Sequence, residues 1–328
     1  MKQRSLGTAT VTVVGCGDLS LPTAAARGRD ARDLAAALDR ALELGITLIE
    51  VAPDADSERL AGEAIRAHRL RDTVTVATHA SGDVRARVEA SLRATRLDVL
   101  PLVQLPHPAR GPELADLCAR LVREGKVLQW GLTADTPPEP APPPPPAPSS
   151  LLVMPWDAAP SPPDSPSKIT FEPWLVSLAL PLSLCDRNAP AVDIPLLARR
   201  PLAGGALAGT LGPGAKLALR DDRAALDTAT LERIAVTAAR LAPFVRDVPL
   251  AARSCDAARA ILESAPRRTR DPEAAALAEL ALRYAIDRGA IALPRMHRVE
   301  HVAEAVAAAS APPLSAELTG QLNEFSVQ

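Results

Sequence analysis

Three side chains that can move protons follow consecutive strand-like segments in the first third of the chain. Glu50 ends a short apolar run, and His79 directly follows the run Thr73–Thr78. His107 comes two residues after the run Asp98–Leu105. If these runs are parallel strands of one sheet, their carboxyl ends meet at the same edge. A carboxylate and two imidazoles there could act as a general acid/base group on a small molecule, because histidine titrates near neutrality.

A carboxylate and two histidines are also the ligand types of a non-haem iron site. His107 lies between Pro106 and Pro108, however, so its side chain can point away from the other two. We therefore assign no metal ligand and treat Glu50, His79 and His107 as candidate catalytic residues. Neighbouring acidic residues and the other histidines have ordinary expected roles, as turn formers, helix caps or surface residues; they are Asp54, Asp56, His68, His297 and His301.

The elements that must position these side chains alternate between strand-like and helix-like through the first 135 residues. Leu34, Leu38 and Leu42, for example, recur at helical spacing, with Asp30 as a cap and Gly45 as a stop. Such alternation predicts βα units around a parallel sheet, and a barrel or an open doubly wound sheet would both fit. The expected strands are 11–17, 46–50, 73–78, 98–105 and 126–132, with helices at 30–45, 57–68, 83–97 and 112–125.

Regularity fails in a proline-rich insertion at 136–170, because proline lacks a backbone donor and disfavours helix at the residue before it. We expect an irregular connector within a single domain that spans residues 1–328. The sixth strand has two candidate positions, Leu151–Pro155 and Leu178–Leu182, and the first is slightly favoured. The second leaves only about ten residues before the next strand, which is short for a parallel crossover.

Composition excludes several classes of protein. The hydrophobic content of 47% is enough for a substantial core, and the net charge of −2 gives no basic face for nucleic acid. The four cysteines are isolated, which is typical of reduced thiols in a cytoplasmic protein. No apolar run reaches the length of a membrane span.

Five short strings in order resemble the aldo/keto reductase family, whose members are (β/α)8 barrels that bind NADPH at the carboxyl ends of their strands. The strings are MKQRSLG, LELGITLIEVA followed by DSERLAGEA, LVREGKVLQWGLT, RRPLAGGALAG and ALPRMHRVEHVAEAV. The resemblance implies an α/β TIM barrel of this type, irregular around strands five to seven. It also implies that Glu50, Thr78 and Leu105 lie at strand ends and face a substrate.

The reductases that the chain resembles use an aspartate, a tyrosine, a lysine and a histidine to protonate the carbonyl oxygen. Carried over by position, these fall on Glu50, Ala55, His79 and Pro106, so none of the four is retained. The only tyrosine, Tyr284, lies in a helical stretch where a packing role is expected. Classical carbonyl reduction is therefore not expected.

The NADPH contacts that the resemblance implies are also altered. The Ser-Asn pair that holds the carboxamide falls on Thr133 and Ala134, and the aromatic that stacks on the nicotinamide falls on Arg199. The glutamine falls on Val153 or Ala179, depending on which segment is the sixth strand. Binding of NADPH is expected to be weakened or lost; the remaining candidate cofactor contacts are Leu202 and Gly204 in PLAGG, and Arg298 and Glu300 after the last strand.

Three function classes remain open. The first is a pseudoenzyme with a scaffold or regulatory role, the second is an enzyme repurposed for non-redox acid/base chemistry at the barrel mouth, and the third is an NADPH-dependent reductase with a different proton donor. An outer barrel wall without its usual helices would need cover from the insertion, from a second copy of the chain or from a partner protein.

Overall fold

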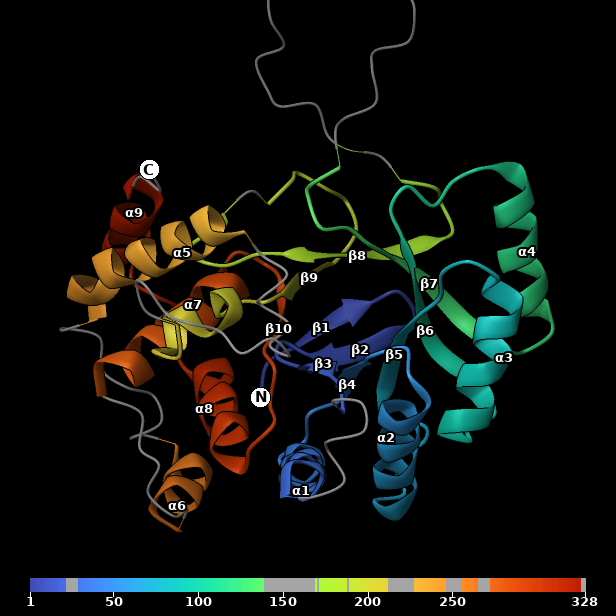
Figure 1. Cartoon of the computed structure of the whole chain (residues 1–328), viewed down its shortest axis with the longest axis horizontal. Coiled ribbons are helices and arrows are strands. Elements are labelled where there is room, and N and C mark those ends of the chain that lie inside the picture. Colours follow the sequence, from blue (N-terminus) through green and yellow to red (C-terminus); the bar gives the residue numbers. More distant parts are fainter. Residues whose placement is uncertain are drawn as a thin grey trace, which may run out of the picture.

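The computed structural model describes residues 1–21, 29–138, 169, 171–187, 189–211, 227–245, 255–264 and 272–325. Eight parallel strands form one sheet in which sequence neighbours pair in order, from the first strand to the last (Figure 1). They are β3 (Cys16–Leu19), β4 (Leu48–Val51), β5 (Thr75–His79), β6 (Leu100–Pro106), β7 (Val127–Thr133), β8 (Leu175–Pro181), β9 (Leu196–Arg199) and β10 (Ile291–Leu293).

Backbone hydrogen bonds join the two ends of this sheet. The amides of Gly15 and Gly17 donate to the carbonyls of Ala292 and Pro294, each at 2.9 Å. A Cβ at position 17 would lie 2.1 Å from the carbonyl oxygen of Leu293, so only glycine allows this approach. The sheet is thereby closed, and the predicted (β/α)8 TIM barrel of aldo/keto reductase type is confirmed.

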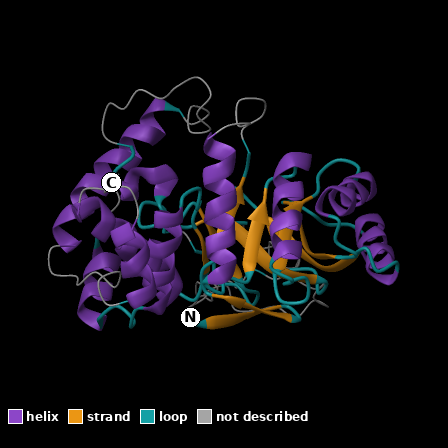
Figure 2. Cartoon of the chain, turned by 90° about the horizontal axis from the view of Figure 1, so that it is seen from below, coloured by secondary structure: helices purple, strands orange, loops and turns teal. Residues whose placement is uncertain are grey.

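An antiparallel hairpin closes the bottom of the barrel near the N-terminus (Figure 2). It consists of β1 (Gln3–Leu6) and β2 (Ala9–Thr12), which turn at Gly7 with a left-handed φ of +59°. Leu6 and Val11 are fully buried against the aliphatic side chains that fill the barrel interior. The predicted single strand 11–17 was wrong, because its first residues belong to this hairpin and only β3 belongs to the barrel.

Helices cover the outside of the barrel over most of its circumference (Figure 1). Those after the first four strands are α1 (Arg29–Glu43), α2 (Ala55–Ala67), α3 (Val84–Thr95) and α4 (Pro112–Arg123); those of the C-terminal half are α5 (Thr228–Leu241), α6 (Asp256–Ser264), α7 (Pro272–Asp287), α8 (Val299–Ser310) and α9 (Ala316–Glu324), with 3-10 helices η1 (Ala203–Ala208) and η3 (Ala242–Val245). The predicted helix caps hold at α2, where the Asp54 carboxylate accepts a hydrogen bond from the amide of Ser57 at 2.9 Å. None of the described helices is long and apolar enough to cross a membrane.

The sixth barrel strand is β8, at Leu175–Pro181, so the favoured position at Leu151–Pro155 was wrong. β8 pairs in parallel with both β7 and β9. Its four central residues from Ser177 to Leu180 are all buried, which suits a parallel strand covered on both faces. Proline is tolerated at its last position, Pro181, because the ladder ends there.

The connection from β8 to β9 contains no helix in its described residues, 182–187 and 189–195. Chain segments on either side of β8 cover its outer face instead. Leu178 and Leu180 belong to a buried cluster against which several half-buried side chains pack, among them Phe171, Trp174, Val192 and Ile194. The expected part of the barrel's outer wall that lacks a helix is therefore present here, and other segments of the same chain cover it. The insertion at 139–168 lies outside the described residues, and self-association stays a prediction.

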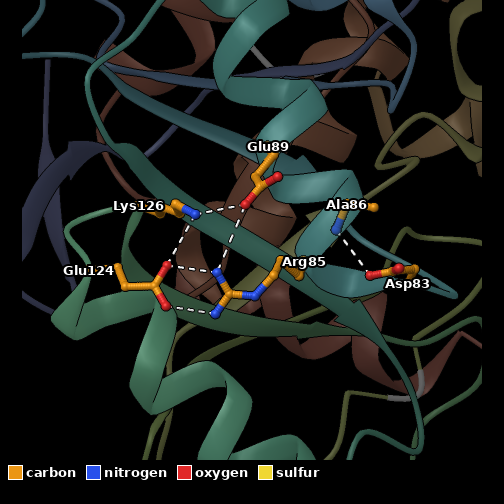
Figure 3. Close-up of polar contacts among 6 residues, drawn as sticks. All are labelled: Asp83, Arg85, Ala86, Glu89, Glu124 and Lys126. Carbon is orange, nitrogen blue, oxygen red and sulfur yellow. Dashed lines mark hydrogen bonds and ion pairs between the residues drawn. The ribbon is translucent and has the colours of Figure 1, made fainter.

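Surface ion pairs tie two neighbouring βα units together (Figure 3). Arg85 on α3 forms a bidentate contact with Glu124 at the end of α4, with N–O distances of 2.6 and 2.7 Å. Lys126, at the start of β7, reaches both Glu89 on α3 and Glu124. Arg85, and then Lys126, lower the pKa of the Glu124 carboxyl to about 2. These pairs are exposed, so they orient the two units more than they stabilise them.

We predict that Gly62→Ala destabilises the protein by about 1–3 kcal/mol, the usual cost of overpacking. α2 and α3 cross at this glycine, where an added Cβ would lie 1.9 Å from the Thr95 carbonyl oxygen. That oxygen already accepts a hydrogen bond from Arg66 at 2.6 Å, which holds it in place. Equilibrium unfolding in urea measures the change.

Gly320→Ala on α9 is the matched control, because a Cβ there meets nothing within 4 Å. This variant is expected to be stabilised by up to about 1 kcal/mol through helix propensity. Changes of the same sign and size in the two variants would contradict the proposed close crossing of α2 and α3.

Candidate functional site

Every second side chain along each strand points into the barrel, and this alternation determines which residues lie at the mouth. Leu48, Ala77 and Leu197 lie in the aliphatic interior cluster. Two residues further along their strands come Glu50, His79 and Arg199, which therefore point to the same side one layer higher. These three side chains are neighbours in the structure.

Glu50 is the centre of this group. Its side chain is only 4% exposed, with Oε1 3.3 Å from Nε2 of His79 and 3.9 Å from Nε of Arg199. The other carboxylate oxygen accepts a hydrogen bond from the Asp18 amide at 3.2 Å. His79 and Arg199 are 21% and 25% exposed, so they separate the carboxylate from solvent.

This environment decides the charge of Glu50. Burial by itself raises the pKa of its carboxyl, but the His79 imidazole, the Arg199 charge and the Asp18 amide together outweigh burial. The net effect is a pKa below the ordinary value. Glu50 is thus an anion at neutral pH, and its negative charge faces one permanent cation and one imidazole.

Arg199 also contacts residues at and just after the carboxyl end of β7. Its Nη1 donates to Oγ1 of Thr133 at 2.9 Å and lies 3.6 Å from a carboxylate oxygen of Asp135. The Asp135 side chain is 91% exposed, so water screens this second contact. The sequence indicated Arg199 only as the position of the stacking aromatic, and its role as a site residue was not predicted. Its place two residues after the apolar Leu197 on the same strand could have indicated that its side chain points to the mouth.

A cavity of about 410 Å³ opens above the group at the carboxyl ends of the strands. Its lining consists of His79, Pro106, His107, Thr133, Ala134, Asp135, Thr136 and Arg199. This volume suits a small molecule, and the carboxyl end of the strands is where such barrels place their active sites.

The structure brings two of the three candidate catalytic residues into contact and places the third nearby. His107 lines the same cavity as His79, and its amide donates to the Thr133 carbonyl at 2.8 Å. Its side chain is exposed and makes no contact with Glu50. Within the described residues no three His, Cys, Asp or Glu side chains gather in a way that could hold a metal ion.

Two residues expected at the mouth face outward instead. Thr78 is buried, and its hydroxyl donates to Oε1 of Glu58 on α2 at 2.7 Å. Leu105 belongs to the cluster between the sheet and the helices outside it. The expectation was wrong because Thr78 and Leu105 each lie one position away from a residue whose side chain points into the barrel.

The candidate cofactor residues lie at two other places on the rim. Leu202 packs against core clusters, and its carbonyl accepts hydrogen bonds from the amides of Gly205 and Leu207 at 2.9 and 3.3 Å. Gly204 follows with a left-handed φ of +64° in a tight 3-10 turn. Arg298 precedes α8, and Glu300 lies in its first turn.

Arg298 lines a second hollow, of about 310 Å³, outside the mouth cavity. The other lining residues are Ser20, Leu21, Asp33, Leu34, Arg295 and His297. Arg295 donates to the hydroxyl of Ser20 at 3.0 Å, which joins the rims after β3 and β10. Two guanidinium groups make this hollow cationic.

Residues 14–139 match the model of the Aldo/keto reductase family. These residues make up less than half of the chain, and over them the chain is similar to that family. No curated protein sequence matches the chain. Solved structures of aldo/keto reductases share the fold of this chain along nearly its whole length, which agrees with the strands and helices described above.

Three solved structures illustrate the similarity. An aldo/keto reductase from Klebsiella pneumoniae in complex with NADP and acetate is 21% identical, with a TM-score of 0.56, over 96% of this chain and 91% of that one. The holo form of an aldo-keto reductase from Bacillus halodurans is 18% identical, with a TM-score of 0.59, over 99% and 96%. A glycerol dehydrogenase from Gluconobacter oxydans is 18% identical, with a TM-score of 0.61, over 97% and 92%.

We predict that Glu50→Gln lowers the free energy of unfolding at pH 7 by about 1–3 kcal/mol, since a neutral amide cannot balance Arg199. The folded-state pKa of Glu50 lies below the ordinary value of 4.5. Its contribution is therefore fully present above pH 4.5 and is lost as the pH falls through the folded-state pKa. Urea unfolding at several pH values measures the gap between wild type and variant.

Glu63→Gln provides the control, because Glu63 is on the surface of α2 and 47% exposed. Its small effect should change little with pH. A gap between wild type and Glu50→Gln that stays constant or widens on acidification would show that the carboxylate is not held as a buried anion.

Proposed function

We propose that this protein is a member of the aldo/keto reductase family that has lost NADPH-dependent carbonyl reduction and transfers protons on a small molecule at the barrel mouth. The observation that carries the proposal is the buried Glu50 carboxylate between His79 and Arg199, directly beneath an open cavity. A buried carboxylate that orients an imidazole is a common arrangement for a general base.

His79 is the proposed acid/base group. Its Nε2 faces Glu50, which favours a proton on that nitrogen and leaves Nδ1 to exchange protons with a ligand. In the proposed reaction, His79 removes a proton from the carbon next to a carbonyl group, and the electron pair moves to the carbonyl oxygen as an enolate. Arg199 stabilises that oxyanion, and His79 returns the proton to the same or another carbon.

Among the described residues, no tyrosine or lysine lies at this mouth to protonate a carbonyl oxygen. Tyr284 is 1% exposed on α7, within a core cluster. Lys2 donates to the Ala311 carbonyl, and Lys126 pairs with glutamates outside the barrel. The remaining lysines, Lys168 and Lys216, lie outside the described residues.

The nicotinamide half of NADPH does not fit the residues at the mouth. The position for the stacking aromatic holds Arg199, whose guanidinium is bound to Thr133 and faces Glu50. The positions for the carboxamide contacts hold Thr133, whose hydroxyl accepts a hydrogen bond from Arg199, and Ala134 and Ala179, whose side chains cannot bond an amide. The amide of Ala134 donates to the carbonyl of Ala179 at 2.9 Å. Solved structures of similar proteins contain NADP or NADPH. By that resemblance the cationic hollow with Arg298 could still hold the phosphate end.

We predict that NADPH shows no saturable binding up to about 100 µM, which lies within the range where enzymes usually saturate. NADPH fluorescence titration measures binding, and absorbance measures its oxidation with a panel of aldehydes and ketones. Tight binding together with steady oxidation would overturn the proposed loss of reduction and favour a reductase with a different proton donor.

We also predict enzyme-dependent exchange of carbon-bound protons for deuterium in D₂O for at least one small enolisable compound. Proton NMR of pyruvate, hydroxyacetone, dihydroxyacetone and butanone follows the exchange without any redox partner. His79→Ala should slow it by about 10²–10⁴-fold, the usual contribution of a general base.

His68→Ala is the matched control, because His68 pairs with Asp39 on the outer helices, away from the mouth. It should leave the exchange rate unchanged. No exchange with any compound, or equal rates in the two histidine variants, would contradict the acid/base proposal and favour a pseudoenzyme.

A further inference from the structure

Among the described residues that line the mouth cavity, Arg199 is the one permanent cation. Arg199 contacts Glu50 through Nε, and Thr133 and Asp135 through Nη1. Its second terminal nitrogen, Nη2, has no partner in the described part of the chain, and the side chain is 25% exposed. One edge of the guanidinium is therefore available to a molecule in the cavity.

The other ionisable groups on the cavity wall also favour an anion. His79 and His107 line it as imidazoles, and Asp135, the one carboxylate among the described lining residues, is 91% exposed. Glu50 lies beneath the wall and is already balanced by His79 and Arg199. A negatively charged ligand in the cavity therefore meets hydrogen-bond donors nearby, whereas water screens the Asp135 carboxylate on the same wall.

We infer that the ligand of this site is a small monocarboxylate, held through its carboxylate by Arg199. This inference rests on the proposed function and names its substrate class. A carboxylate can accept a charge-assisted hydrogen bond from Nη2, which holds the ligand against this wall of the cavity. The cavity of about 410 Å³ accommodates a compound of a few carbons.

A carboxylate also places the reacting atoms correctly for His79. In a 2-oxo acid, the carboxylate on Arg199 holds the carbonyl and its neighbouring carbon against the wall that Arg199 shares with His79. A dianionic phosphate suits the site less well, because Arg199 is the one permanent cation among the described lining residues and its charge is already shared with Glu50. Arg199 is therefore a binding residue that selects singly charged acids over neutral ketones.

The experiment compares pyruvate with pyruvamide, which has the same shape and no charge, by isothermal titration of the full chain. We expect pyruvate to bind at least about tenfold more tightly, as charged hydrogen bonds normally allow. Inorganic phosphate should bind more weakly than pyruvate. Equal affinity for pyruvate and pyruvamide, or tighter binding of phosphate, would overturn the inference without any variant.

Two variants assign the effect to one side chain. Arg199→Gln should remove the preference for pyruvate, whereas Arg200→Gln, the same change at the exposed neighbour, should keep it. Because Arg199→Gln leaves Glu50 without its cation, the double variant Glu50→Gln, Arg199→Gln is measured as well. It should fold with a neutral pair and also bind the two compounds equally. Retention of the preference in the double variant would overturn the role of Arg199.

Failure of this inference is distinguishable from failure of the proposed function. If deuterium exchange on neutral ketones depends on His79 while carboxylates bind no better than amides, the carboxylate inference is wrong and the acid/base function stands. If carboxylates bind through Arg199 but no compound exchanges protons, the substrate class of the cavity stands and the acid/base function is wrong.

Discussion

The Glu50 charge inside the barrel is the constraint on which the mouth depends. A carboxylate away from water is tolerated only when cations and hydrogen-bond donors replace its hydration. Here the replacements come from three different strands: His79 on β5, Arg199 on β9 and the Asp18 amide on β3. Each must reach the same two oxygen atoms, so the register of these strands cannot shift by one residue without leaving the charge unpaired.

This requirement connects the site to the irregular side of the barrel. β9 pairs in parallel with β8, and this pairing places Arg199 at the mouth, within reach of Glu50. The short connection through residues 182–195 replaces a helical crossover, and half-buried side chains such as Trp174 and Ile194 cover the strand it leaves. The sheet therefore stays closed although the described residues of this connection contain no helix, and the closed sheet brings Arg199 to the mouth.

The fold that this chain shares with solved aldo/keto reductases does not by itself fix its reaction. Solved reductases at 18–21% identity share the barrel over more than nine tenths of both chains. Barrel folds keep their architecture through interior and outer packing, whereas reactions depend on a few side chains at the strand ends. In this chain the strand ends hold the His79 imidazole, the Arg199 guanidinium and the Glu50 carboxylate.

The sequence by itself determined the βα order, most helix boundaries and the identity of Glu50 and His79, because apolar periodicity and cap residues such as Asp54 act over a few neighbouring positions. It also determined that the single tyrosine, Tyr284, is in a helix. Only the tertiary structure decided which segment is the sixth strand, and that Thr78 faces a helix while Arg199 faces Glu50. Those outcomes depend on contacts between different elements of the fold, some of them as distant in the sequence as Arg199 and Glu50. They also depend on a pleat in which one position separates the inside of the barrel from the outside.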